Sequence, residues 1–274
     1  MQKALWITTA LVATALTAGT VYFNNAAEMA DVPTGAQSPA KSSTKTLLAR
    51  ASATKQSREP VVVEFFTSQG CSSCPPSDRL AAKLAKEPDL LVIQRPVTYW
   101  DRLGWKDTLG KSANTELQRA YARRTLKGRN GVYTPQAVVN GAAGVVGSRE
   151  SDLRQLIAVT RAGGNAPQIK IARKPDGSAE VMVMGGSASD AQVKLVGLDR
   201  SETVKVGRGE NGGRTLSYTN IWKGERMLGT LMGGSASYMV DGSDRSIAGA
   251  NSYAIVIRQG SAGKVLGGRM LPNA

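Results

Sequence analysis

The feature that most constrains the fold of this chain is a pair of cysteines between a short apolar run and a helical pattern. The run VVVEFF, which begins at Val61, is β-branched and aromatic, as expected of a buried strand. Cys71-Ser-Ser-Cys74 follows after a short turn, and Ser77–Lys86 then carries the apolar stripe of a helix. This order of strand, thiols and helix predicts an α/β layer with the cysteines at a helix N-terminus.

That position predicts redox chemistry. The positive end of a helix dipole favours a thiolate, so the pKa of Cys71 is expected to fall. Cys74 lies three positions on, close enough to attack a mixed disulfide, which makes Cys71 the predicted nucleophile and Cys74 the resolving thiol. Pro75 and Pro76 remove backbone donors from the first turn and weaken this effect.

The two thiols could instead bind a metal or form a fixed structural disulfide. The chain has two cysteines and no histidine, which excludes Ser-His-Asp and Cys-His catalysis and the usual Cys/His zinc sites. We therefore expect no metal and no cofactor. Copper handling through thiols and methionines is a weaker alternative, because imidazole ligands are absent. A fixed structural disulfide stays open, since exported proteins often keep inert ones, although so small a loop stabilises little.

Further candidate residues flank the cysteines in the chain. Glu64 lies in the predicted strand, where a buried carboxylate could accept the proton of Cys74; the alternative is a partly exposed glutamate at a strand edge. Thr134-Pro135 precedes another predicted strand, and a cis bond there would present backbone to a peptide bound at the disulfide. Both features fit the redox interpretation.

An aromatic segment forms the last candidate group. Trp100, Asp101 and Trp105 lie in a predicted irregular loop, Asp101–Gly110 and the residues just before it. They could form a substrate shelf near the disulfide, with Asp101 as a polar contact. The alternative is a structural loop whose tryptophans fill a core that is poor in aromatic residues.

The chain divides into four predicted parts. Residues 1–27 have one lysine, an uncharged apolar run and small residues, typical of a signal peptide or N-terminal anchor. Residues 28–60 are predicted to be a disordered basic linker. Residues 61–165 alternate strands and helices, with further strands at Leu90–Val97 and Gln136–Asn140, a hairpin turn at Asn140-Gly141, and a last helix capped by Ser148. Residues 166–274 carry short alternating segments that predict an antiparallel β-sandwich.

The net charge of +14 bears on partners more than on fold. Part of it lies on one predicted helix, Asn114–Lys127, and just after it, at Arg119, Arg123, Arg124, Lys127 and Arg129. Because an exported protein rarely meets nucleic acid, we favour an anionic envelope surface as the partner of these basic residues. The alternative is that they form a solvated face with no partner. Gly207–Gly213 is glycine-rich, but it lacks the setting of a phosphate loop and predicts a hairpin turn.

Several motifs in order resemble known proteins: FTSQGCSSCPPSD, YWDRLGWKD, VYTPQAVVNG and GRGENGGRTLSYTN. They resemble a bacterial family of secreted thioredoxin-like proteins of unassigned function, over about Val61–Leu271. The resemblance implies a thioredoxin-like fold, with Pro135 at the cis-proline position facing the cysteines. It also marks a departure, because the family has histidine and aspartate where Pro96 and Thr98 stand here, which implies an altered or inactive member if those residues act in the family.

The sequence therefore predicts an α/β protein, a thioredoxin-like domain followed by an antiparallel β-sandwich-like domain. Its leading function is that of an exported thiol–disulfide oxidoreductase or redox-responsive protein, acting on protein thiols or disulfides in the cell envelope. We expect it in the periplasm or secreted, or held at the inner membrane by an uncleaved N-terminal segment. The alternative is a non-catalytic envelope binding protein with a fixed disulfide.

Overall fold

The computed structural model describes residues 59–126, 131–164, 166–186 and 190–272. The predicted signal segment and all but the last two residues of the predicted linker lie outside these ranges, as do Lys127, Gly128 and Arg129. The described residues belong to one compact unit, Lys55–Ala274. Among them, no helix has the length and apolarity needed to cross a membrane.

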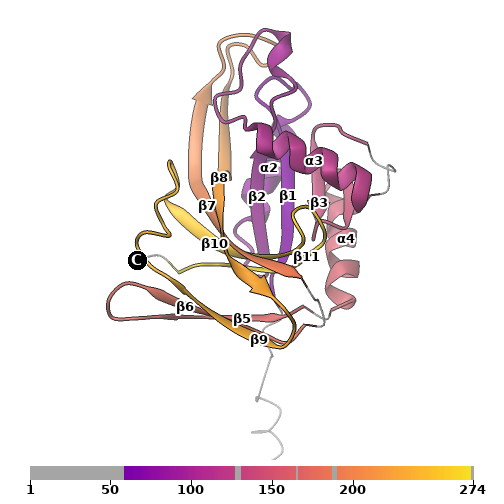
Figure 1. Cartoon of the computed structure of the whole chain (residues 1–274). Helices are drawn as coiled ribbons and strands as arrows, with labels where there is room; N and C mark the ends of the chain where they lie inside the picture. Colours follow the sequence, from indigo (N-terminus) through magenta and orange to yellow (C-terminus); the bar gives the residue numbers. More distant parts are fainter. Residues whose placement is uncertain (1–58, 127–130, 165, 187–189, 273–274) are drawn as a thin grey trace, which may run out of the picture. The chain divides into compact units, whose positions relative to one another are not determined.

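The first half of the described chain alternates strands and helices around four strands in the order β2-β1-β3-β4. β1 runs parallel to β2 and antiparallel to β3, and β3 pairs antiparallel with β4. This is the thioredoxin-like arrangement that the sequence predicted (Figure 1). Its elements are β1 (Val61–Thr67), α2 (Pro75–Leu84), β2 (Leu90–Pro96), η1 (Asp101–Leu103), α3 (Ser112–Arg124), β3 (Gln136–Val139), β4 (Ala143–Val146) and α4 (Glu150–Ala162).

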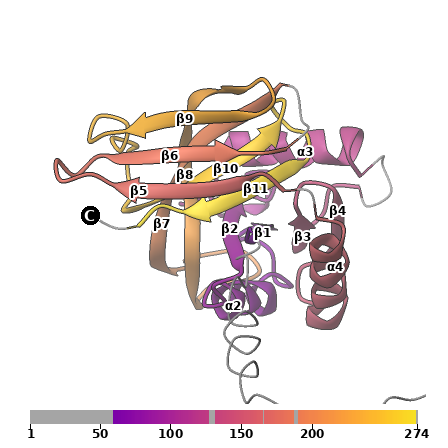
Figure 2. The same ribbon diagram turned by 90° about the horizontal axis from the view of Figure 1, so that it is seen from below.

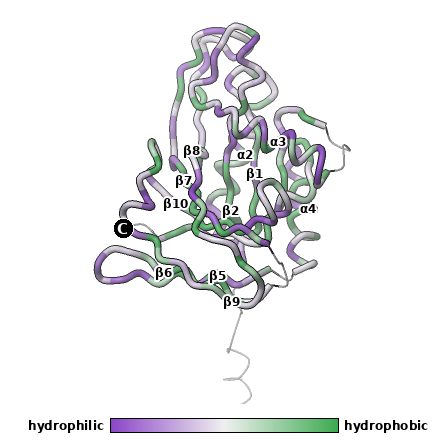
Figure 3. Tube along the Cα trace, viewed as in Figure 1, coloured by the Kyte–Doolittle hydropathy of each residue, from purple (hydrophilic) through white to green (hydrophobic). Residues whose placement is uncertain are grey.

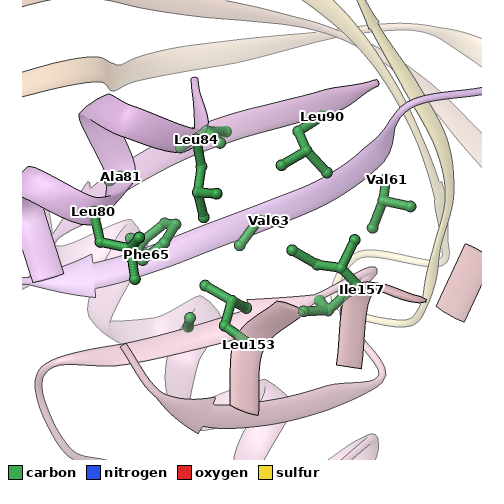
Figure 4. Close-up of a cluster of buried hydrophobic side chains, with 12 residues drawn as sticks. Val61, Val63, Phe65, Leu80, Ala81, Leu84, Leu90, Leu153 and Ile157 are labelled. Atoms are coloured by element: carbon green, nitrogen blue, oxygen red, sulfur yellow. The ribbon is translucent and has the colours of Figure 1, made fainter. Parts of the chain in front are cut away.

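The core of this half lies between the sheet and helices α2 and α4. Every residue of β1 and β2 is buried, as continuous apolar runs predict for parallel strands. Alternate residues of β1, among them Val63 and Phe65, point toward Leu84 of α2 and Leu153 of α4 (Figure 4). The hydropathy colouring shows the same concentration of apolar residues in these central strands (Figure 3).

Three helix starts differ from the prediction. α3 begins at Ser112, two residues before Asn114. α2 begins at Pro75, earlier than Ser77, because proline has a helical φ and needs no donor at the first position. α4 begins at Glu150 with Arg149 before it and no side-chain cap, so the predicted capping by Ser148 is wrong. The hairpin turn is confirmed, since Asn140 and Gly141 have φ values of 45° and 61°.

The second half consists of long antiparallel strands, and it is not detached from the first. Strands β7, β8, β10 and β11 extend the first sheet to eight strands, where β8 meets β2 in parallel at Gln94↔Ile221. The strands are β5 (Gln168–Arg173), β6 (Ala179–Met184), β7 (Ala191–Lys205), β8 (Thr215–Leu231), β9 (Ser235–Val240), β10 (Ser252–Gln259) and β11 (Val265–Met270).

A second sheet, in the order β5-β6-β9, covers part of the large one. Alternating residues of β6, such as Val181 and Val183, pack against Val193 and Ile257 of the large sheet, which makes a sandwich (Figure 2). Another apolar cluster, with Val62 and Leu91 against residues of β7 and β10, joins the two halves. The predicted fold class is confirmed, while the boundary at residues 165 and 166 stays a prediction.

Candidate functional site

The two cysteines form a disulfide at the start of α2. Their Cα atoms are 5.4 Å apart, a normal separation for a disulfide. Cys74 is the residue that precedes the helix, and Pro75 and Pro76 occupy its first two positions, so two of the donors that would face the sulfurs are missing. Both cysteines are 0% exposed, although Ser72 and Ser73 between them are exposed.

The loop that carries Cys71 is held from one side by the segment after η1. Gln69 is the centre of these contacts: its N–H donates to Asp107 Oδ2 at 2.8 Å, and its Oε1 accepts from Trp105 Nε1 at 2.8 Å. Burial raises the pKa of the Asp107 carboxyl, and the nearby charge of Asp101 adds to the rise. The hydrogen bond to Gln69 makes Trp105 part of the packed loop, in agreement with the alternative that the tryptophans of this loop are structural.

The tip of the β7–β8 hairpin, residues 206–214, packs against the segment after η1 and holds the same loop. Asn211 is fully buried, and its Nδ2 donates to the carbonyl oxygens of Gln69 at 3.0 Å and Cys71 at 2.8 Å. Glu210 Oε2 accepts the N–H of Ser72 at 2.9 Å. The predicted hairpin turn is confirmed, and its contact with the cysteines is a feature that the sequence analysis missed, because the residues are about 140 positions apart.

The predicted cis bond is present between Thr134 and Pro135. Trp100 links this bond to the cysteine loop: its Nε1 donates to Thr134 Oγ1 at 2.8 Å, and its Cβ would lie 3.1 Å from a Cβ added to Gly70. Asp101 takes a supporting part, since its Oδ1 accepts the N–H of Asp107 at 3.1 Å. The structure thus gathers Trp100, Asp101, Trp105 and Thr134-Pro135 around the segment that leads to Cys71.

Glu64 is buried as predicted, and the strand-edge alternative is wrong. Its Oε1 accepts from Arg95 Nε at 2.6 Å and from Arg258 Nη2 at 3.0 Å, and the hydroxyl of Tyr121 donates to Oε2. Burial by itself would raise the pKa of Glu64, but the positive charges of Arg258 and Arg95 outweigh it and lower the pKa. A carboxylate held this way is a poor proton acceptor, so these contacts disfavour the role predicted for Glu64.

A second buried carboxyl, which the sequence analysis did not single out, lies closer in the chain to the cysteines. Asp78 is in the first turns of α2, and its N–H donates to the carbonyl oxygen of Cys74 at 3.1 Å. Residues four apart share one helix face, so the Asp78 and Cys74 side chains start from the same face at the beginning of α2. Its Oδ1 accepts from Gln94 Nε2 at 2.8 Å, and its buried Oδ2 has no hydrogen-bond partner.

The environment of Asp78 favours the neutral carboxyl. Burial raises its pKa to about 8, and the charge of Asp107 acts in the same direction. Asp78 is therefore mostly protonated near pH 7, unlike Glu64. Its position could have been found from the sequence, because it falls four residues after Cys74 beside the apolar stripe of the predicted helix.

Two remaining expectations concern Pro96 and Thr98, where the resembling family has histidine and aspartate, and the basic residues of α3. Pro96 and Thr98 both face α3: the Pro96 carbonyl accepts from Asn114 Nδ2 at 3.0 Å, and Thr98 Oγ1 lies 3.0 Å from Thr115 Oγ1. Arg119, Arg123 and Arg124 are exposed on α3. Within the described residues, no group of three or more Cys, Asp or Glu side chains is arranged to hold a metal ion.

Comparison with known proteins places the chain beside uncharacterised ones. The model of a family described as "Protein of unknown function (DUF1223)" matches residues 62–258. The crystal structure of protein AGR_C_4864 from Agrobacterium tumefaciens is 30% identical, with a TM-score of 0.68 over 79% of this chain and 96% of that one. HBP35 of Porphyromonas gingivalis shares the fold at 13% identity, with a TM-score of 0.54 over 79% and 76% of the two chains. No curated protein matches.

Proposed function

This chain belongs to the DUF1223 family of proteins of unknown function, and we propose that it is a thiol–disulfide oxidoreductase related to the thioredoxin superfamily. The observation that carries the proposal is the Cys71–Cys74 disulfide at the junction of β1 and α2, with the buried Asp78 carboxyl four residues further along the helix. The cis Thr134-Pro135 bond, joined to the cysteine loop through Trp100, supports it.

In the proposed reaction, the thiolate of a partner attacks the Cys71 sulfur. A bond forms between the partner sulfur and Cys71 Sγ, the Sγ–Sγ bond of the disulfide breaks, and its electron pair leaves with Cys74. A second partner thiolate then attacks the partner sulfur, which releases Cys71 and completes the oxidation of two thiols to a disulfide. The same steps in reverse would reduce a partner disulfide.

In this proposal, Asp78 gives a proton to Cys74 and takes it back. Below pH 8 its carboxyl carries a proton, which it gives to the Cys74 thiolate as the disulfide opens. In the reverse direction the carboxylate takes that proton back, so that Cys74 attacks as a thiolate. Asp78 thus takes over the role that the sequence analysis gave to Glu64, whose charge is already committed to Arg95 and Arg258.

The partners and location of this reaction follow from the same proposal. An oxidising compartment such as the periplasm keeps the disulfide formed, so we place the protein there or outside the cell, with envelope proteins that carry thiols or disulfides as substrates. The exposed arginines of α3 suit a nearby anionic envelope surface.

The test is disulfide exchange by the purified oxidised protein. The wild type should oxidise a reduced model protein, Cys71→Ser should abolish the activity, and Cys74→Ser should accumulate a mixed disulfide through Cys71, detected by mass spectrometry. Asp78→Asn should slow exchange while leaving the disulfide in place. Asp152→Asn, which changes an exposed carboxylate of α4 in the same way, is the matched control and should leave the exchange rate unchanged.

The second candidate function is a binding protein with a fixed disulfide, and the complete burial of both sulfurs favours it. In that case the pair would resist glutathione, and no mixed disulfide would form with Cys74→Ser. Those two results together would reject the oxidoreductase.

A further inference from the structure

The enclosure of the disulfide has to be relieved before any exchange can occur. Both sulfur-bearing residues are 0% exposed, so a partner thiolate has no direct approach to Cys71 Sγ in this arrangement. For exchange to occur, the attacking sulfur must reach Cys71 Sγ and end about 2 Å from it, the length of the new disulfide bond. Some element packed around the loop that carries Cys71 must therefore move, and two elements are hydrogen-bonded to that loop: the segment after η1 and the β7–β8 hairpin tip.

The two elements bind the cysteine loop through different kinds of hydrogen bond. The segment after η1 is anchored to Gln69 through the buried Asp107 and through Trp105 and Thr108, and it belongs to the same half of the chain as the cysteines. The hairpin tip reaches the loop only by side chains. Asn211 makes two hydrogen bonds to backbone carbonyls, and Glu210 makes one to the Ser72 N–H, at an exposed position.

The tip is also shaped for this contact. Arg214 Nη1 donates to Asn211 Oδ1 at 2.8 Å, which orients the amide so that its Nδ2 faces Gln69 and Cys71. Gly207 lies against the Trp105 ring, where an added Cβ would come within 2.8 Å of Cζ3. Glycine therefore lets the hairpin approach closely, and the stem joins the large sheet through β8, where Gln94 bridges Asp78 and the N–H of Thr219.

We propose that the β7–β8 hairpin tip is a gate on the redox pair, in which Asn211 and Glu210 are positioning residues that hold Cys71 enclosed and oxidised until the tip is released. The inference rests on the proposed function and adds the regulation of that same site. It also gives the second half of the chain a part in the chemistry.

Glu210 acts on the reactivity of Cys71 as well as on its enclosure. Its carboxylate occupies the Ser72 N–H, a donor next to Cys71 that could otherwise stabilise a thiolate. Its negative charge beside Cys71 also opposes a second negative charge there. While the gate is closed, both effects favour the disulfide; release of the tip removes both together.

The experiment measures the rate at which dithiothreitol and glutathione reduce the disulfide in the full chain. Glu210→Gln should raise the rate about fivefold, because a neutral amide oxygen accepts the Ser72 N–H more weakly than a carboxylate does. Asn211→Ala should raise it about tenfold or more, because both hydrogen bonds from this side chain to the loop are lost. Glu116→Gln, an exposed carboxylate on α3, is the matched control and should leave the rate unchanged. In a Cys74→Ser background, Glu210→Gln should lower the pKa of the Cys71 thiol, followed by thiolate absorbance.

The outcomes separate the gate from the proposed function. Equal reduction rates in wild type and both variants, with an unchanged Cys71 pKa, would reject the gate even if the protein catalyses exchange. Faster reduction in the variants with no exchange activity on any protein substrate would support the gate and reject the oxidoreductase. Glu210→Gln keeps the test decisive if Asn211→Ala does not fold, because Glu210 lies at the exposed surface of the tip.

Discussion

Two carboxyl groups in the core of this protein have opposite charge states for reasons that each residue's neighbours supply. Glu64 faces two guanidinium groups, which offset the cost of burial and keep it ionised. Burial is the largest influence on Asp78, and its neighbours, the Thr67 hydroxyl, the Gln94 amide and the Asp107 carboxyl, include no buried cation, so the pKa is raised to about 8. Burial therefore leaves one residue a structural anion and the other a neutral carboxyl, the state that the proposed proton transfer requires.

Asp78 should impose a pH dependence on stability. In the unfolded chain its pKa is near 3.8 and in the folded protein about 8, so folding takes up a proton between these values. The unfolded state then binds fewer protons, and the free energy of unfolding falls as pH rises through this window. Asp78→Asn should remove that slope and stabilise the protein at pH 9 by on the order of a few kcal/mol relative to wild type.

Urea unfolding at intervals from pH 5 to pH 9 measures this effect. Asp152→Asn, at an exposed position in α4, is the control and should keep the wild-type slope. A slope in Asp78→Asn equal to that of the wild type would show that Asp78 does not carry the proton.

At the scale of elements, α3 shows how a helix can bury a polar face. Apolar periodicity alone would place Leu117, Ala120 and Tyr121 on the inner face. Tyr121 is buried, but Leu117 and Ala120 are half-buried, whereas the polar Asn114 and Gln118 are fully buried. Asn114 Oδ1 accepts from Arg95 Nη1 at 3.1 Å, and Gln118 Nε2 donates to Gln136 Oε1 at 2.8 Å. Apolar periodicity in the sequence cannot identify such a polar face, because the hydrogen-bond partners of its residues come from separate strands.

Tyr121 is the residue of α3 with the largest expected effect. Its hydroxyl donates to Glu64 and accepts from Arg258, so removal leaves both charged groups short of a partner. Tyr121→Phe should lower the free energy of unfolding by about 1–3 kcal/mol. Tyr238→Phe is the matched control and should change little, because its buried hydroxyl has no partner. Urea denaturation compares the two, and similar losses would contradict the assigned network.

At the scale of the molecule, buried charges tie the two halves of the chain together. Glu64 of β1 and Arg95 of β2 come from the first half, and Arg258 comes from β10 in the second. The guanidinium groups of the two arginines also lie over aromatic rings. Arg95 lies over Trp222 and Arg258 over Tyr121, each 5.3 Å from the ring centre. The network therefore depends on the packing of both halves on each other.

The network holds two positive charges and one negative charge, which predicts an order of effects. Glu64→Gln leaves two buried guanidinium groups without a counter-charge and should cost about 3–5 kcal/mol of unfolding free energy. Arg258→Met leaves the one-to-one pair of Glu64 and Arg95 and should cost less, about 1–3 kcal/mol. Denaturant midpoints at pH 7 test the order. A larger loss in Arg258→Met would show that packing around position 258, and not charge balance, dominates.

The sequence alone determined the features that depend on local pattern. The continuous apolar run of β1, the adjacent cysteines, the Asn140-Gly141 turn and the Thr134-Pro135 bond are all properties of a few neighbouring residues, and each is present in the structure. The α/β class followed from their order. Ser148 was misplaced as a cap, because cap position depends on where the chain enters the helix.

Tertiary structure alone decided which distant residues share the site. β8 joins β2 and carries Asn211 and Glu210 to the cysteine loop, and Arg258 reaches Glu64 from 194 positions away. No local pattern encodes such meetings, because they follow from strand pairing and from the free energy of burying both faces of one sheet. The opposite pKa shifts of Glu64 and Asp78 have the same origin, because they depend on which charges the fold places beside each carboxyl.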